Sequence, residues 1–335
     1  MALGLSSVTV LFGPNGVGKS TVLRAFRILG GLRMRGGRLV APGAVPFAYL
    51  YSPVEVGLRV PFPRRRCLEL VLSHPRALAV AGEVDAEFGR ALAQCDFGEV
   101  SISAVLAPGE SYSLVVDGTV EVGGVVLRLG SARVGGREVG LGRGDAGALF
   151  EFFSAVVSPA SAADVLKRGV GFECLEVVGL RPENGRVRDL ATGVQVRFED
   201  LGEGERLMLA IARAASYVKG GGREPVLLEL SARGLYDEAA VALLRCAYEG
   251  LREGVVVVET SDPSVAALFA LLGARVYGMY KTGDGAKAVL LRGVEELGSP
   301  PGELAEYLAS RGLSRDMLSG ASLKLLEIYA KAAPP

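Results

Sequence analysis

Residues 13 to 20 read GPNGVGKS, and this stretch decides the fold of the chain. It fits the pattern G-x-x-x-x-G-K-[ST] without a gap. The apolar run SVTVLF before it predicts a short buried strand. The stretch STVLRAFRILGG begins at the last serine of the motif and has the apolar spacing of a helix. A glycine-rich turn between a strand and a helix points backbone N–H groups and a helix dipole at one place, which favours phosphate binding.

The loop therefore predicts a site for a triphosphate. Lys19 can reach the β- and γ-phosphates, and Ser20 can place its hydroxyl on Mg²⁺. A glycine-rich turn that binds nothing is the alternative. The residues expected to bind ATP are Gly13, Pro14, Asn15, Gly16, Val17, Gly18, Lys19, Ser20 and Thr21.

Helical and strand patterns alternate from residue 201 onward. Alternation of this length predicts an α/β fold, here a P-loop NTPase core with a largely parallel sheet. Residues 98–140 are rich in turn signals and predict an antiparallel β meander, and residues 144–169 predict an inserted helical segment. The strands expected in the parallel sheet include Val226–Leu230, Val255–Glu259 and Arg275–Tyr280.

Four parts of the chain are expected. They are an N-terminal part of the ATP-binding core (1–72), a lid-like β-meander and helical insertion (73–170), a C-terminal part of the core (171–300) and a helical tail (301–335). Within the first part, Phe47–Tyr51 and Leu68–Leu72 are predicted as short strands.

The composition narrows the class of protein. Lys+Arg and Asp+Glu are both 37, so no net charge attracts nucleic acid or an anionic membrane. Only seven of the basic residues are lysines, which fits a GC-rich genome or a hot, archaeal-like habitat. The N-terminus has no signal-peptide pattern and no apolar run approaches about 20 residues, so we expect a cytoplasmic protein without a membrane span.

The cysteines and the single histidine argue against a metal site. Cys67, Cys95, Cys174 and Cys246 form no C-x-x-C pair, so neither a zinc site nor a disulfide framework is expected. They are predicted to be buried free thiols in a reducing compartment. His74, in a proline-containing loop, is predicted to be structural.

The order of the motifs resembles that of ABC-type ATPases. After GPNGVGKST come LGEGE at 201–205, a strand ending in an acid, and VVVVETSDP at 255–263. The chain looks like the branch that holds SMC, RecF and OLD-like proteins and the related AAA-type core ATPases of archaea and bacteria. The resemblance covers residues 5–30 and about 195–280, and it implies ATP and Mg²⁺ as cofactors.

The resemblance also implies a signature loop that acts on a second subunit. In that family two subunits sandwich ATP, and the signature loop of one caps the γ-phosphate held by the other, so a homodimer through the nucleotide is expected. The usual serine is replaced by glycine, and an ordinary helix N-terminus is the alternative. The signature residues would be Leu201, Gly202, Glu203, Gly204 and Glu205.

Two alignments with the family are possible for Glu229, the acid in the strand Val226–Leu230. Aligning the Gly-Leu at 234–235 with that of the family places Glu229 on the Mg²⁺-associated aspartate and Leu230 on the glutamate that polarises water. The other register places Glu229 on the catalytic acid. In the first, Ser20 and Glu229 hold the metal, no base is certain, and Glu259 is either a substitute base or a solvated charge.

The phosphate-binding residues persist, whereas those that activate water are altered. Leucine cannot accept a proton, the switch histidine of the family is replaced by Ser261, and neither Gln94 nor Gln195 has the spacing of a glutamine loop. A positioned base contributes typically about 10²–10⁴-fold. The predicted function is therefore a nucleotide-gated dimerising switch with weak or absent hydrolysis.

Two other functions stay open. An active, DNA-associated ATPase in a RecF-, SMC- or OLD-like repair or defence role would use a substitute base. Its nucleic acid contacts would come from two basic clusters, with a protein partner also expected. A P-loop kinase or GTPase is the third candidate, although no guanine-reading NKxD motif is present. The basic clusters are Arg33, Arg35 and Arg38, and Arg64, Arg65 and Arg66.

Overall fold

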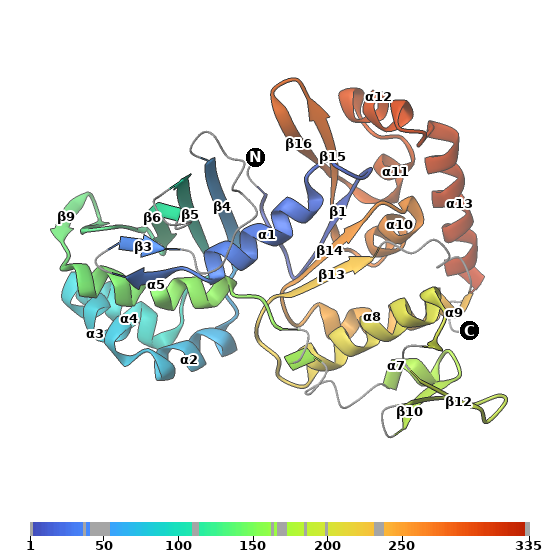
Figure 1. The fold of residues 1–335 in the computed structure, drawn as a ribbon, viewed down its shortest axis with the longest axis horizontal. Helices are drawn as coiled ribbons and strands as arrows, with labels where there is room; N and C mark the ends of the chain where they lie inside the picture. Colours follow the sequence, from blue (N-terminus) through green and yellow to red (C-terminus); the bar gives the residue numbers. More distant parts are fainter. Residues whose placement is uncertain are drawn as a thin grey trace. The chain divides into compact units, whose positions relative to one another are not determined.

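The computed structural model of the chain describes residues 3–35, 38–40, 54–108, 114–161, 164–165, 173–183, 186–197, 200–230 and 238–331. The chain divides into two compact units (Figure 1). Unit 1 comprises Ser6–Ser20 and Ala160–Pro335, and unit 2 comprises Thr21–Pro159 with Ala2–Leu5. Among the described residues, no helix is long and apolar enough to span a bilayer.

Unit 1 is built on a five-stranded sheet in the order β13-β14-β1-β15-β16. The first four strands run parallel, and β16 pairs antiparallel with β15. All five residues of β1 are buried, as expected for a central parallel strand covered on both faces. The predicted α/β class with a largely parallel sheet is confirmed. The strands are β1 (Val8–Phe12), β13 (Val226–Leu230), β14 (Val256–Thr260), β15 (Arg275–Thr282) and β16 (Gly285–Leu291).

The helices of unit 1 pack on this sheet through apolar faces. α8 packs against β13 and α9, and α10 packs against β1, β14 and β15. Tyr217 on α8 and Phe269 on α10 are fully buried in the resulting core. The helices that include residues of unit 1 are α1 (Lys19–Gly30), α7 (Glu173–Glu176), α8 (Glu203–Lys219), α9 (Glu238–Leu251), α10 (Pro263–Leu271), α11 (Gly293–Gly298), α12 (Gly302–Ser310) and α13 (Arg315–Lys331).

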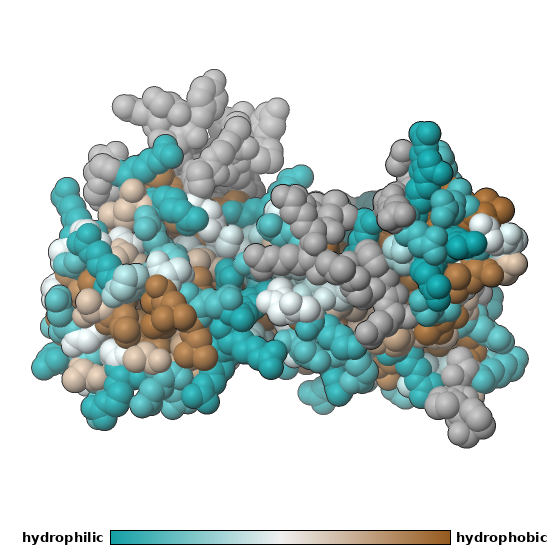
Figure 2. Space-filling model, turned by 90° about the horizontal axis from the view of Figure 1, so that it is seen from below, coloured by the Kyte–Doolittle hydropathy of each residue, from teal (hydrophilic) through white to brown (hydrophobic). Residues whose placement is uncertain are grey.

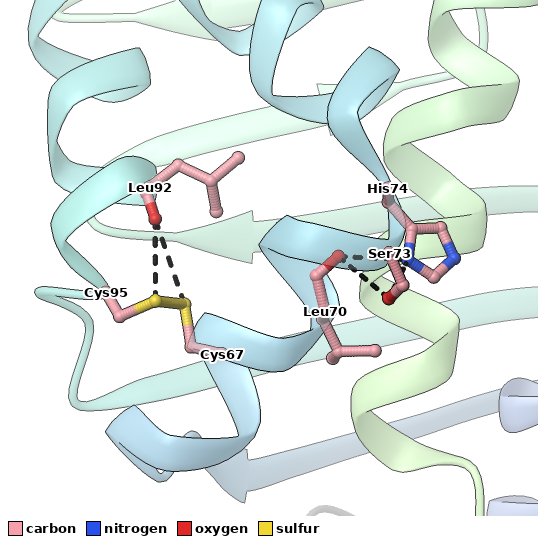
Figure 3. Close-up of a disulfide and its surroundings, with 6 residues drawn as sticks. All are labelled: Cys67, Leu70, Ser73, His74, Leu92 and Cys95. Atoms are coloured by element: carbon pink, nitrogen blue, oxygen red, sulfur yellow. Dashed lines mark hydrogen bonds between the residues drawn. A yellow bond between two sulfur atoms is a disulfide. The ribbon is translucent and has the colours of Figure 1, made fainter.

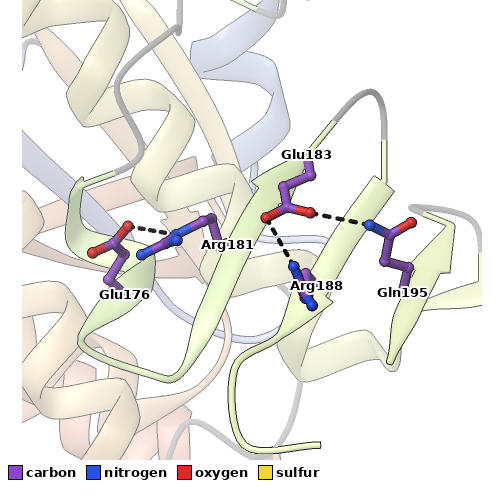
Figure 4. Close-up of polar contacts among 5 residues, drawn as sticks. All are labelled: Glu176, Arg181, Glu183, Arg188 and Gln195. Atoms are coloured by element: carbon purple, nitrogen blue, oxygen red, sulfur yellow. Dashed lines mark hydrogen bonds and ion pairs between the residues drawn. The ribbon is translucent and has the colours of Figure 1, made fainter. Parts of the chain in front are cut away.

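A small antiparallel sheet precedes α8. It consists of β10 (Leu180–Glu183), β11 (Arg186–Asp189) and β12 (Gln195–Arg197). The Gln195 side-chain amide donates to Glu183 at 3.0 Å, and Glu183 also pairs with Arg188 at 3.6 Å (Figure 4). One of the two glutamines of the chain is thus engaged on this sheet.

The described residues of unit 2 form an antiparallel sheet, the helices α2 to α5 and residues 21–30 of α1. The strands β5 to β9 follow one another as the predicted meander, and α5 packs against β2 and β5. The strands are β2 (Arg33–Arg35), β3 (Arg38–Val40), β4 (Val54–Pro61), β5 (Glu99–Pro108), β6 (Leu114–Val122), β7 (Val125–Arg128), β8 (Ser131–Val134) and β9 (Arg137–Gly140). The helices are α2 (Arg64–Ser73), α3 (Pro75–Val84), α4 (Ala86–Gln94) and α5 (Arg143–Val157).

The strand predicted at Leu68–Leu72 is wrong, because these residues lie within α2. The buried side chains of this helix, Arg66, Cys67 and Leu70, recur at helical spacing, whereas Leu68 and Leu72 face outward. A short apolar run does not distinguish a strand from a helix by itself. The strand predicted at Phe47–Tyr51 lies outside the described residues.

The prediction of free thiols is also wrong, because all four cysteines are paired. Cys67 on α2 is bonded to Cys95 at the end of α4, and both sulfurs lie within 3.8 Å of the Leu92 carbonyl oxygen (Figure 3). Cys174 on α7 is bonded to Cys246 on α9, and in each pair the Cα atoms are 5.6 Å apart. The partners are 28 and 72 residues apart in sequence, and such pairing is decided by the fold rather than by spacing.

His74 has the structural role predicted for it. Its ring lies edge-on to Phe152 at 5.9 Å between centroids. Its Nδ1 is 3.0 Å from the Leu70 carbonyl oxygen and 3.0 Å from the Ser73 hydroxyl (Figure 3).

Candidate functional site

The loop between β1 and α1 has a backbone that only glycine adopts readily. Gly13, Gly16 and Gly18 have φ values of 157°, 82° and 100°. A Cβ atom on Gly13 would lie 2.5 Å from the carbonyl oxygen of Met279 on β15, closer than side chains approach backbone. The loop is therefore fitted against the carboxyl end of the sheet.

Contacts to the neighbouring strands hold the loop in place. The Gly13 N–H donates to the Thr260 carbonyl of β14 at 3.3 Å, and the Val17 side chain is fully buried. Asn15, Gly16 and Ser20 are exposed. The buried part of the loop thus anchors it, and the exposed part is left for a ligand.

Lys19 is buried beneath the loop, with 4% of the residue exposed. Its ammonium donates to the carbonyl oxygens of Gly13 at 2.7 Å and Pro14 at 2.9 Å. Burial lowers the pKa of Lys19 from its ordinary value, and the negative charge of Glu259 partly offsets this. An anionic ligand on the loop would favour the charged form in the same way.

Glu259 is the carboxylate that meets the loop. The Ser20 hydroxyl donates to its Oε1 at 2.9 Å, and its Oε2 is buried and has no hydrogen-bond partner among the described residues. It lies opposite Leu11 of β1 on one side and Glu229 of β13 on the other. Glu259 is therefore a half-buried carboxylate that is hydrogen-bonded to the loop.

Glu229 and Leu230 end the next strand outward. Glu229 is exposed, whereas Leu230 is 1% exposed and belongs to the apolar core of unit 1. Because successive strand residues point to opposite faces, Glu229 lies on the same face as Glu259. The Gly-Leu at 234–235, on which one register depends, lies outside the described residues.

A cavity of about 70 Å³ lies beside the loop, with room for a few water molecules. Two of its lining residues were not assigned to the site from the sequence: Thr260, and Ser261, which was named only as the altered switch position. They reach the cavity because β14 pairs in parallel with β1, the strand that precedes the loop. The lining residues are Asn15, Lys19, Glu229, Leu230, Glu259, Thr260 and Ser261.

The residues around this cavity fit a magnesium ion. Mg²⁺ prefers oxygen ligands and is commonly bound by one or two carboxylates with substrate phosphates rather than by an all-protein cage. The Ser20 hydroxyl and the unpartnered Oε2 of Glu259 supply such oxygens, and Glu229 lies beside them. Within the described ranges no group of three or more His, Cys, Asp or Glu side chains could form a cage.

The predicted signature loop lies at the N-terminus of α8. Gly202 is the N-cap residue, and its N–H donates to the Glu205 carboxylate at 2.8 Å. Leu201 is buried, whereas a Cβ atom added to Gly204 would meet nothing within 4 Å. None of these residues lines the cavity at the phosphate loop of the same chain.

The basic cluster on α2 is not a uniform surface. Arg66 is 8% exposed, and its guanidinium donates to the Ala155 carbonyl at 2.8 Å, so it holds α2 to α5. Arg64 and Arg65 are exposed on the same helix as Leu72, whose side chain is 82% exposed. On the face drawn in Figure 2, hydrophobic residues gather in patches among hydrophilic ones.

Comparison with known proteins gives a family match to the phosphate-loop region and structural matches over 86% of the chain. A family model described as "AAA domain, putative AbiEii toxin, Type IV TA system" matches residues 8–59. The crystal structure of the SmcHead bound to the C-winged helix domain of ScpA is 16% identical, covers 86% of this chain and 91% of its own, and has a TM-score of 0.44. The SMC head domain from Thermotoga maritima is 15% identical, with coverages of 86% and 92% and a TM-score of 0.41. No curated protein matches the chain.

The family match includes β1 and the whole phosphate loop. The loop stands at the carboxyl end of a central strand, in a parallel sheet with the acid-bearing strands β14 and β13 beside it. Residues 8–59 thus resemble an AAA-type domain, and the loop that they contain lies in an α/β fold with a largely parallel sheet, as its motifs predicted.

Proposed function

We propose that the chain binds Mg·ATP at the loop Gly13–Thr21 and uses it as a switch between a monomer and a homodimer. The observation that carries the proposal is the preformed loop, with a buried Lys19 beneath it and Ser20 bonded to a carboxylate. Backbone N–H groups and the N-terminus of α1 supply the remaining attraction for phosphate.

The position of α8 is the reason for proposing a homodimer. The turn at 201–205 opens a helix of 17 residues, whose positive end suits a phosphate, but it does not line the cavity of its own chain. Gly204 has free space around its Cα atom. A second copy could therefore bring a bound γ-phosphate to this turn.

Hydrolysis is proposed to be slow. In either register one of the two acids expected at the end of this strand is replaced by a buried leucine, Leu230 in the first and Leu228 in the second. The turnover number should lie well below the median enzyme value of about 10 s⁻¹. A turnover number at or above that value would contradict a switch with a reduced catalytic site.

The test combines calorimetry with sedimentation. Lys19→Ala should weaken binding of Mg·ATP at least about 30-fold, since removing a charged hydrogen-bond donor costs about 2 kcal/mol. Gly204→Asp should leave binding to the monomer intact and abolish dimerisation with a non-hydrolysable ATP analogue, because it places a negative charge against the phosphate. Gly320→Asp on α13, where a side chain also meets nothing within 4 Å, is the matched control. Unchanged affinity in Lys19→Ala would refute the proposal.

A further inference from the structure

The carboxylates at the phosphate loop come from two different strands, and only one of them contacts the loop. β14 lies directly beside β1, whereas β13 is one strand further out. Neighbouring strands are about 4.8 Å apart, so β13 is roughly 10 Å from the strand that carries the loop. Glu259, on the nearer strand, accepts a hydrogen bond from Ser20.

The second oxygen of Glu259 needs a partner. Oε2 is buried and no described group donates to it. A buried carboxylate oxygen without a donor is unfavourable unless a cation or a donor satisfies it. The Ser20 hydroxyl beside it is the group that the loop motif places on a metal ion.

Glu229 differs from Glu259 in its exposure and in its hydrogen bonding. It is exposed, it lines the same cavity, and it makes no hydrogen bond or ion pair with any described residue. Its neighbours along β13, Leu228 and Leu230, are both buried and apolar. Glu229 thus lines the cavity without a partner among the described residues.

We propose that the metal-side carboxylate of this protein is Glu259 of β14, and that Glu229 of β13 is the general base for its residual hydrolysis. The inference rests on the proposed function. It selects the second of the two registers, in which Leu228 takes the place of the metal-associated acid and the neighbouring strand supplies that acid instead.

The reaction balances without any further reactant. Water attacks the γ-phosphorus, a new P–O bond forms, and the bond to the β–γ bridging oxygen breaks with its electron pair leaving on ADP. Glu229 accepts the proton that the attacking water loses. The products are ADP and phosphate.

The test measures the metal dependence of nucleotide binding separately from turnover. Glu259→Gln, Glu229→Gln and the exposed control Glu253→Gln are titrated with ATP in EDTA and over a range of Mg²⁺ concentrations. Mn²⁺ binding in the presence of ATP is followed by electron paramagnetic resonance. Phosphate release is measured on the same samples.

Glu259→Gln should raise the Mg²⁺ concentration for half-maximal ATP binding at least tenfold and leave binding in EDTA unchanged. Glu229→Gln should leave the Mg²⁺ and Mn²⁺ titrations within threefold of the wild type but lower phosphate release at least tenfold. Circular dichroism should show that all three variants are folded. Glu259→Asp is a second variant at this position, and it keeps the negative charge.

Three outcomes overturn the inference. The first is a metal titration that follows Glu229 instead of Glu259, the second is an equal shift in both variants, and the third is a wild type whose phosphate release does not depend on Glu229. Failure of the wild type to bind ATP at all, with or without Mg²⁺, would instead refute the proposed function itself.

Discussion

The N-termini of α1 and α8 both follow glycine-rich turns, yet their surroundings differ. The turn before α1 has three glycines with positive φ, a buried lysine, and a backbone hydrogen bond to β14. Gly202 before α8 has a φ of −59°, which any residue adopts, and the space around Gly204 is open. One turn is enclosed by its own chain, and the other is not.

The difference indicates which part of the proposed two-chain nucleotide site a single chain can form by itself. The phosphate loop needs a fixed backbone, because its N–H groups must point at phosphate oxygens before the ligand arrives. A turn that caps a ligand held by another copy needs an unobstructed approach instead. If the proposed function is correct, glycine serves a conformational purpose at Gly13 and a steric purpose at Gly204.

The largest effect is expected from one substitution made at both turns. Gly13→Ala places a Cβ atom 2.5 Å from the Met279 carbonyl oxygen and requires a positive φ, so it should lower the free energy of unfolding by about 3 kcal/mol. Gly204→Ala, in the first turn of α8, should change it by less than about 1 kcal/mol in either direction.

Urea unfolding followed by circular dichroism measures both variants. Equal losses of stability would contradict the distinction between an enclosed and an open turn. Calorimetry adds a second readout, because Gly13→Ala should also weaken ATP binding, whereas Gly204→Ala should not.

The next effect concerns the disulfide near α8. Cys174–Cys246 links α7 to α9, and both helices pack against α8. Closing a span of 72 residues contributes about 2–4 kcal/mol. The double variant Cys174→Ala/Cys246→Ala should lose about that much unfolding free energy in unit 1, while folded protein keeps its affinity for Mg·ATP, since the phosphate loop contains no cysteine.

Alkylation after mild reduction gives an independent check. Cys246 is exposed and Cys67 is fully buried, so dithiothreitol should open Cys174–Cys246 first. The control variant Cys67→Ala/Cys95→Ala should destabilise unit 2 instead. Simultaneous reduction of both bonds in the folded protein would contradict this difference in accessibility.

The same contrast explains which features the sequence could predict. The loop motif lies between a strand and a helix within about thirty residues, so local patterns were sufficient, and the bounds of β13 were predicted as they are found. The contact between Ser20 and Glu259 spans 239 residues and depends on β14 lying next to β1. Local periodicity contains no information about strand order, so the sequence suggested Glu259 only as a substitute base.

The disulfides were missed for a related reason. A pair such as Cys67 and Cys95 forms because α2 and the end of α4 place two Cα atoms 5.6 Å apart. Disulfides are rare in cytosolic proteins, with hyperthermophiles as the exception, and the shortage of lysine had already left a hot habitat open. The expected cytoplasmic location stays a prediction.

The smallest effect is expected at the cap of α8. The Glu205 carboxylate accepts a hydrogen bond from the Gly202 N–H, which is one of the two bonds of a capping box. The second bond is missing, because glycine has no side chain that could accept from the backbone of Glu205. Glu205→Ala should therefore lower the free energy of unfolding by about 0.5–1 kcal/mol, and Glu205→Gln, which keeps an acceptor, by less. Neither change should alter ATP binding to the monomer, measured by calorimetry, because α8 contributes nothing to the cavity of its own chain. A loss of monomer affinity in Glu205→Ala would mean that the two turns act on the same bound nucleotide within one chain, and the distinction between them would fail.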